Sequence, residues 1–254
     1  MRSYSGLQII AALLLVGLLV GVLACGGGGG GGGGGSTAVA LSSINYPDAQ
    51  FEACVNASIA PGGENEGATM SDQITVLANS QCACPGASIS DLTGIENFTN
   101  LTSGVFYVNS ISDLTPLAGL TKLVTLDLEY NNISDVSPLA ALTKLTSLKL
   151  NNNSSIVDVS PLASLTSLAN LELENNGVID VSPLAALTQI DMLSVRANAV
   201  TTGVATLVAL TAASQIDLQD NNSMPCADLT TLLGELGNPP VLPSSVQSGI
   251  NCAP

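Results

Sequence analysis

The middle of the chain repeats a block of about twenty-two residues. The clearest copy runs from Leu120 to Ala141 and reads LTKLVTLDLEYNNISDVSPLAA. A period of this length predicts small structural units stacked in line, because a single unit cannot bury its own apolar side chains. Aligned copies form a proline column of Pro116, Pro138, Pro161 and Pro183, and an asparagine column of Asn109, Asn131, Asn153, Asn176, Asn198 and Asn221.

Leucines alternate with other residues in each copy, which is typical of a short strand with one buried face. Leu126 and Leu128 are predicted to point inward, and Asp127 between them outward. In the first full copy, Gly104 stands at the position of Leu126 and brings no apolar side chain to the core. The inward columns are Phe106, Leu128, Leu150, Leu173, Val195 and Leu218, and Leu126, Leu148, Leu171, Leu193 and Ile216.

The spacing L-x-x-L-x-L-x-x-N-x-I resembles that of leucine-rich repeats. The resemblance implies an α/β solenoid, a right-handed horseshoe. A parallel β-sheet would form its concave face and short 3₁₀ or α turns its convex face. In such repeats the asparagine bonds to the backbone of adjacent turns, so the resemblance implies that structural role for the six asparagines of the column.

Each return path opens with a motif such as Ser137-Pro138. Serine is predicted to accept from the free N–H groups of a short helix, and proline suits the first helical position. An aspartate column precedes this motif and suggests either turn capping or a calcium ladder. Capping is favoured, because no glycine-rich aspartate loop accompanies it, and no metal site is predicted. The column comprises Asp91, Asp113, Asp135, Asp158 and Asp180.

The first forty residues differ from the repeats. Residues 1–24 combine Arg2 with an apolar run and are predicted to be a signal peptide. The sequence Val22-Leu23-Ala24-Cys25 resembles a bacterial lipobox, which implies lipid attachment at Cys25. The alternatives are a plain secretory signal or a retained anchor. Residues 25–40 contain ten glycines in a row and are predicted to be a flexible tether. By resemblance to lipoproteins, glycine after Cys25 implies sorting to the outer membrane or cell surface.

Charge narrows the possible partners. The sequence contains five Lys and Arg residues and twenty Asp and Glu residues, which gives a formal net charge of −15. This balance argues against binding nucleic acid or docking the folded part on anionic lipid. The chain has no histidine, so no histidine-dependent triad is possible. A shallow face is a poor site for a carboxylate pair, so we expect a non-enzymatic protein without a cofactor.

Five further cysteines lie outside the repeats, where an exported solenoid would need closing. Residues 41–88 are predicted to form an N-terminal cap, 89–222 the repeats and 223–254 a C-terminal cap. Residues 47–55 are predicted to start a helix. Cys54 is expected to pair with Cys84, or alternatively with Cys82, and Cys226 is expected to pair with Cys252.

The S-P-L-A-x-L turn within a 22-residue period resembles bacterial leucine-rich repeats of the internalin type. The capped layout is similar to that of secreted or surface lipoproteins of Gram-negative bacteria. The resemblance implies a displayed module that binds a protein. The chain departs from the pattern through an insertion near Ser154-Ser155 and a degraded copy at 200–210. The degraded copy is expected to bulge the convex side without breaking its strand.

The variable strand positions are the candidate binding residues. We expect Lys149 to lie between Asp127 and Glu172, and Glu174 to lie beside Arg196. Tyr107 is either an interface anchor or a cover for the edge of the core. A glycan-binding surface lipoprotein and a structural envelope protein remain the alternatives. The candidate partner-binding residues are Tyr107, Asp127, Glu129, Lys149, Glu172, Glu174 and Arg196.

Overall fold

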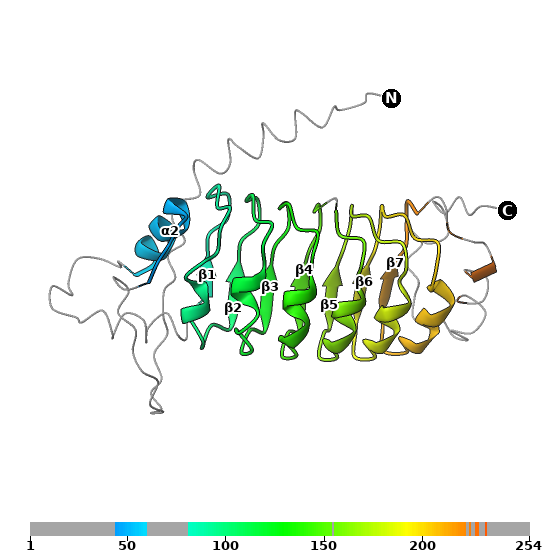
Figure 1. Ribbon diagram of the computed structural model, residues 1–254. Helices are drawn as coiled ribbons and strands as arrows, with labels where there is room; N and C mark the ends of the chain where they lie inside the picture. Colours follow the sequence, from blue (N-terminus) through cyan, green and yellow to red (C-terminus); the bar gives the residue numbers. More distant parts are fainter. Residues whose placement is uncertain are drawn as a thin grey trace, which may run out of the picture.

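The computed structural model describes residues 44–59, 81–153, 155–221, 224, 227, 228 and 232. In this part of the chain, one strand from each repeat joins a single parallel sheet in sequence order (Figure 1). The strands are β1 (Gln81–Ala83), β2 (Ser103–Val105), β3 (Thr125–Asp127), β4 (Ser147–Lys149), β5 (Asn170–Glu172), β6 (Met192–Ser194) and β7 (Gln215–Asp217). The sheet therefore begins inside the range predicted to be the N-terminal cap. Residues 1–24, the tether at 25–40, Cys226 and Cys252 lie outside the described residues.

The strand register follows the sequence period. Leu126 pairs with Leu148, and Leu148 pairs with Leu171, so equivalent residues of successive repeats lie side by side. The short helices lie on the side opposite the sheet (Figure 1). This arrangement confirms the leucine-rich-repeat horseshoe, with the sheet on the concave face and 3₁₀ turns on the convex face. None of the helices within the described ranges has the length and apolar character needed to span a membrane.

The two inward leucine columns form the core. All their side chains are buried, and each contributes about 1.5–3 kcal/mol of transfer free energy. Gly104 fits this core because its neighbours are large. A Cβ atom at Gly104 would lie 2.9 Å from Cε2 of Phe106 and 3.1 Å from Cδ1 of Leu126. The Phe106 ring therefore fills the space that a leucine occupies in the later repeats.

The convex turns are 3₁₀ helices, but serine does not cap them as predicted. Ser137 is the first residue of η4, and the position before it has no side-chain cap. Asp135 supplies the acceptor instead: its Oδ1 accepts the Ser137 N–H at 2.8 Å, which also lowers the pKa of Asp135 below its ordinary value. Asp113, Asp158 and Asp180 accept the equivalent N–H at 2.8 Å. The helices are η2 (Ile95–Asn97), η3 (Thr115–Leu117), η4 (Ser137–Ala141), η5 (Ser160–Ser164), η6 (Ser182–Ala186) and η7 (Val204–Ala209).

The degraded copy keeps its strand and changes only its return path. Gly203 precedes η7 with φ of +86°, and a Cβ atom there would lie 2.2 Å from the Ser182 nitrogen. Only glycine suits this position, since a side chain would meet both the positive φ and the clash. Thr202 forms a β-bridge with Asp180, while β7 remains paired in register with β6. The strand is unbroken, as predicted, whereas the predicted bulge on the convex side stays a prediction.

The asparagine column forms a continuous ladder of hydrogen bonds. Asn153 Nδ2 donates to the carbonyls of Leu150 at 2.9 Å and Leu128 at 3.1 Å, and Asn153 Oδ1 accepts the Ile133 N–H at 3.1 Å. Each carbonyl serves two asparagines, because Asn131 also donates to Leu128 O. The ladder thus ties every repeat to the one before it. Asn131, Asn153 and Asn221 are buried, whereas Asn109, Asn176 and Asn198 are half-buried.

One rung of the ladder is incomplete. Asn176 Oδ1 is buried and accepts no hydrogen bond in the described part of the chain. The preceding repeat contains the extra residue at the Ser154-Ser155 insertion, and the Ser155 N–H bonds to Asn153 O at 2.7 Å. The incomplete rung thus follows directly on the repeat with the extra residue, and we attribute the missing hydrogen bond to that insertion.

Helix α2 (Ala49–Ile59) closes the N-terminal end of the core with Phe51 and Val55. Asp48 caps it, because its Oδ1 accepts the Gln50 N–H at 2.9 Å and the Phe51 N–H at 3.0 Å. Its Oδ2 accepts the Ser90 N–H at 2.7 Å, so one carboxylate joins the cap to the first repeat. Burial alone would raise the pKa of Asp48, but these backbone hydrogen bonds outweigh it and lower that pKa.

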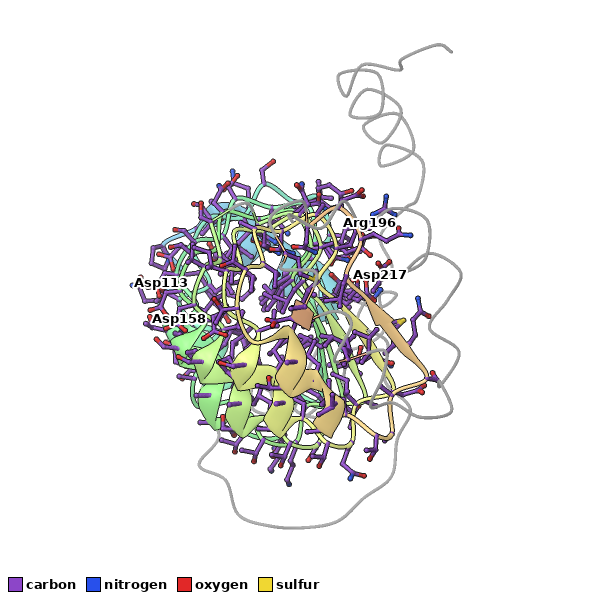
Figure 2. All side chains as sticks on the ribbon, turned by 90° about the vertical axis from the view of Figure 1, so that its right-hand side faces the viewer. Asp113, Asp158, Arg196 and Asp217 are labelled. Atoms are coloured by element: carbon purple, nitrogen blue, oxygen red, sulfur yellow. A yellow bond between two sulfur atoms is a disulfide. The ribbon has the colours of Figure 1, made fainter. Side chains whose placement is uncertain are left out.

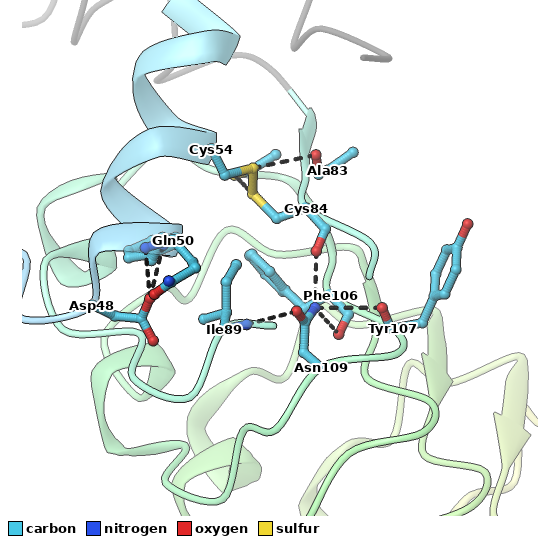
Figure 3. The surroundings of a disulfide bond; sticks show 11 residues. Asp48, Gln50, Cys54, Ala83, Cys84, Ile89, Phe106, Tyr107 and Asn109 are labelled. Carbon is cyan, nitrogen blue, oxygen red and sulfur yellow. Dashed lines mark hydrogen bonds between the residues drawn. A yellow bond between two sulfur atoms is a disulfide. The ribbon is translucent and has the colours of Figure 1, made fainter. Parts of the chain in front are cut away.

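A disulfide between Cys54 and Cys84 links the same helix to the residue after β1 (Figure 3). The two Cα atoms lie 6.0 Å apart, a normal separation for a disulfide. Cys82, the alternative partner, is also buried, and its Sγ lies 3.9 Å from that of Cys84. The N-terminal cap therefore has a covalent link in addition to the Asp48 bonds.

Candidate partner-binding face

The outward strand residues form rows across the sheet. We call the row at the last strand position the central row, and the row two residues further along the edge row. Register pairs Asp127 with Lys149 and Lys149 with Glu172, which places the central row as predicted. The central row is Val105, Asp127, Lys149, Glu172, Ser194 and Asp217; the edge row is Tyr107, Glu129, Asn151, Glu174, Arg196 and Gln219.

Main-chain hydrogen bonds continue past the strands and hold the edge row in the same order. The Val108 N–H bonds to Glu129 O at 2.9 Å, and the Asn152 N–H bonds to Glu174 O at 2.8 Å. The residue after each edge-row position adopts a left-handed backbone, where the chain leaves the sheet. These residues are Val108, Tyr130, Asn152, Asn175, Ala197 and Asp220, with φ between 53° and 61°.

Four carboxylates and one ammonium group occupy the centre of the face. We call Asp127, Glu129, Glu172 and Glu174 the acidic cluster; all four are half-buried. Lys149 Nζ lies 3.1 Å from Glu172 Oε1, so its strongest pairing is with the following repeat. Four carboxylates against one ammonium group leave a formal charge of −3 here.

Asn151 organises this cluster, and sequence reasoning did not include it among the candidate site residues. Its Nδ2 donates to Glu129 Oε1 at 2.6 Å and to Glu172 Oε2 at 2.8 Å, and its Oδ1 accepts the Glu174 N–H at 2.7 Å. Asn151 is only 7% exposed although it belongs to an outward row. Its place between two glutamates in the edge row is the sequence signal for this role.

Two carboxylates of the cluster, Asp127 and Glu129, have raised pKa values. Burial raises the pKa of Asp127, and the Glu129 N–H and the charge of Lys149 only partly offset it. Burial followed by the charge of Asp127 raises the pKa of Glu129. Burial would lower the pKa of Lys149, but the hydrogen bond and charge of Glu172 raise it. The cluster therefore favours the arrival of positive charge.

Arg196 lies beside Glu174 in the edge row, as predicted, but forms its ion pair with Asp220. Its Nη2 lies 2.8 Å and its Nε 2.9 Å from Asp220 Oδ2, whereas Glu174 Oε1 accepts a hydrogen bond from Ser194 Oγ at 2.9 Å. Asp220 lies at the left-handed turn of the next repeat, outside the alternating strand pattern, so sequence reasoning missed it. Arg196 and Asp217 project on the sheet side, opposite Asp113 and Asp158 (Figure 2).

The tyrosines lie at the N-terminal end of the face and are exposed. Tyr107 is 38% exposed, Tyr130 is 49% exposed and Val108, next to Tyr107 in the sequence, is 40% exposed. Tyr107 points away from Phe106 and the disulfide (Figure 3), so its ring does not cover the core. We call Tyr107, Val108 and Tyr130 the apolar patch.

The face offers carboxylate, amide, guanidinium and phenol groups for recognition. Within the described ranges, no three His, Cys, Asp or Glu side chains are placed to hold a metal ion. Its chemistry is that of a surface with polar rows and aromatic groups at one end, which suits contact with a large ligand.

A family model described as leucine-rich repeats, in two copies, matches residues 121–164. No curated protein matches the sequence. Internalin C2 of Listeria monocytogenes superposes with a TM-score of 0.55 at 28% identity, covering 74% of this chain and 90% of that one. The chain carries leucine-rich repeats and is similar to internalins in structure.

Two further solved structures share the fold. An internalin of Listeria monocytogenes has a TM-score of 0.54 at 24% identity, covering 77% of this chain and 69% of that one. A leucine-rich-repeat protein of Leptospira interrogans has a TM-score of 0.53 at 20% identity, covering 63% and 40% respectively. These likenesses extend the comparison from the matched residues 121–164 to most of the chain.

Proposed function

We propose that the concave sheet face binds a partner protein, without catalysis. The observation that carries this proposal is the alignment of the central and edge rows, which places variable polar side chains from six repeats on one continuous surface. Extended concave surfaces of this kind are the usual binding sites of solenoid proteins. The likeness to internalins supports recognition of a protein ligand.

A steric block tests the face without assuming the partner's chemistry. Ser147 lies at the start of β4 and points outward, whereas Ser134 is exposed on a return path. Full-length wild type, Ser147→Trp and Ser134→Trp would serve as bait in quantitative capture from extracts of the source cells and of the cells they contact. We expect Ser147→Trp to reduce partner capture by about tenfold, because it obstructs the centre of the interface. Ser134→Trp should capture as wild type does; equal capture by both variants would exclude the sheet face.

We also propose that the module is displayed on the outer membrane or cell surface by lipid on Cys25. The lipobox-like sequence and the ten glycines after it support this arrangement. A glycine run of that length spans roughly 16–19 Å as a flexible coil, enough to hold a folded module clear of its anchor.

Cys25→Ser tests the anchor. We expect the variant to move from the membrane fraction to the soluble fraction, because serine cannot carry the proposed lipid. Cys82→Ser, another cysteine replacement, serves as the control and should remain with the membrane. Retention of Cys25→Ser in the membrane fraction would refute lipid anchoring.

A further inference from the structure

The apolar patch adjoins the acidic cluster on the same face. Tyr107, Val108 and Tyr130 account for half of the large apolar side chains that are exposed in the described part of the chain. The Val108 N–H bonds to Glu129 O at 2.9 Å, so the patch and the cluster share a backbone contact. Exposed aromatic groups beside charged groups are typical of protein-binding surfaces.

The backbone holds the patch in place. Val108 and Tyr130 have φ of 57° and 54°, which is unfavourable for side chains of this size. The Tyr130 N–H bonds to Asn151 O at 2.9 Å, and the Asn109 N–H bonds to Tyr130 O at 3.1 Å. The same left-handed turn recurs in six successive repeats and so belongs to the fold, and a patch held in this way loses little entropy on binding.

The neighbouring carboxylates retain acceptor capacity. Asn151 bonds Oε1 of Glu129, and Ser194 bonds Oε1 of Glu174. The second oxygen of each carboxylate accepts no hydrogen bond from any residue that the structure describes. A guanidinium or ammonium group can donate to such oxygens and relieve the excess negative charge.

We propose that this surface binds an extended polypeptide segment of the partner that carries Lys or Arg close to an apolar side chain. The proposal rests on the function proposed above and names the chemistry of its partner. Tyr107 and Glu174 follow β2 and β5, which are three strand spacings apart, or about 14 Å. An extended chain covers that distance in about four residues, so the apolar residue and the cation lie within about four positions of each other.

Charge complementarity selects this occupant over others. A second copy of the chain carries the same formal charge of −15 and would be repelled at the acidic cluster. Nucleic acid and anionic lipid carry the wrong sign for the same reason. A cationic segment with an apolar anchor matches both halves of the surface.

Selection from a random dodecapeptide library on full-length protein tests the proposal. We expect selected peptides to be enriched in Lys or Arg within about four positions of an aromatic or aliphatic residue, and to bind less tightly in high salt. The double variant Glu129→Gln/Glu174→Gln should lower the affinity of these peptides by about tenfold or more, because it removes two negative charges while glutamine keeps the size and shape of glutamate. The double variant Tyr107→Ala/Tyr130→Ala should also lower peptide affinity, because it removes the rings that contact the apolar residue of the peptide.

Asp113→Asn/Asp158→Asn is the matched control. It removes the same two charges from the opposite side of the solenoid (Figure 2), and asparagine can still cap a turn. We expect peptide affinity to stay within about twofold of wild type, since these charges lie on the opposite side of the solenoid and salt screens their effect. Equal weakening by both double variants, selection without cationic enrichment, or no peptide dependent on the sheet face would overturn the proposal.

These outcomes are separable from failure of the proposed function. If Ser147→Trp abolishes partner capture while Glu129→Gln/Glu174→Gln leaves it unchanged, the face binds a partner of different chemistry and the present inference is wrong. If Ser147→Trp captures the partner as wild type does, the function itself is wrong.

Discussion

Replacing Asn153 by alanine is expected to lower the free energy of unfolding by about 2–4 kcal/mol. The substitution removes the acceptor that the Ile133 N–H has within the described residues, and one donor each from the Leu128 and Leu150 carbonyls. A buried N–H without a partner costs about 1–3 kcal/mol, and the small cavity adds to that cost. Denaturant unfolding followed by circular dichroism would measure the loss.

Asn176→Ala provides the internal control. Asn176 donates to Leu150 O and Leu173 O like the other ladder residues, but its Oδ1 accepts nothing in the described structure. Removing the Asn176 side chain leaves no backbone N–H without a partner. We therefore expect Asn176→Ala to lower the free energy of unfolding by less than Asn153→Ala does, the difference being about 1 kcal/mol or more. Equal losses, or a larger loss at Asn176, would contradict the assignment of the incomplete rung.

Removing the disulfide with Cys54→Ala/Cys84→Ala is expected to destabilise the N-terminal cap by about 3–4 kcal/mol. The two cysteines are 30 residues apart in sequence, and the bond limits the freedom of that loop in the unfolded state. Because each repeat contacts only its neighbours, the loss should appear first as opening of α2 from the core, while the distant repeats stay folded. Limited proteolysis with and without reductant would show early cleavage in the cap.

Cys82→Ala distinguishes this pairing from its alternative. The Cys82 and Cys84 sulfur atoms lie 3.9 Å apart, so Cys82 is the cysteine best placed to replace Cys84 as the partner of Cys54. If Cys54 pairs with Cys84, reductant still promotes cleavage of the cap in the Cys82→Ala variant. In Cys54→Ala/Cys84→Ala, reductant has no further effect on cleavage. A reductant response that disappears in Cys82→Ala would instead assign the bond to Cys82.

The parts of the fold that depend on periodicity were predictable. Leucine spacing alone places the strands in register, because a shift by one residue would expose Leu126 and Leu128 and bury Asp127. The sequence predicted two caps for these turns, the aspartate column and the serine before proline, and only the aspartate cap is confirmed. Asp135 and Ser137 are both good caps, and only the backbone path shows that the aspartate accepts the serine N–H.

The candidate site was predictable in its rows and not in its pairings. Asp127, Lys149 and Glu172 lie side by side because the backbone places them there. Arg196 has a long side chain that reaches several acceptors, and its partner Asp220 lies at a turn that strand alternation does not describe. The sequence period predicts which residues are neighbours on adjacent strands. Which of several nearby groups a long side chain contacts depends on its conformation in the folded protein.

The insertion near Ser154-Ser155 and the altered return path at Gly203 both leave the neighbouring strands in register. Length variation is thus absorbed away from the binding rows. It follows that mutations can change the convex return paths without changing the central and edge rows, and the reverse. Duplication of a whole repeat would widen the front surface by one strand, about 4.8 Å, while the N-terminal cap keeps its existing contacts.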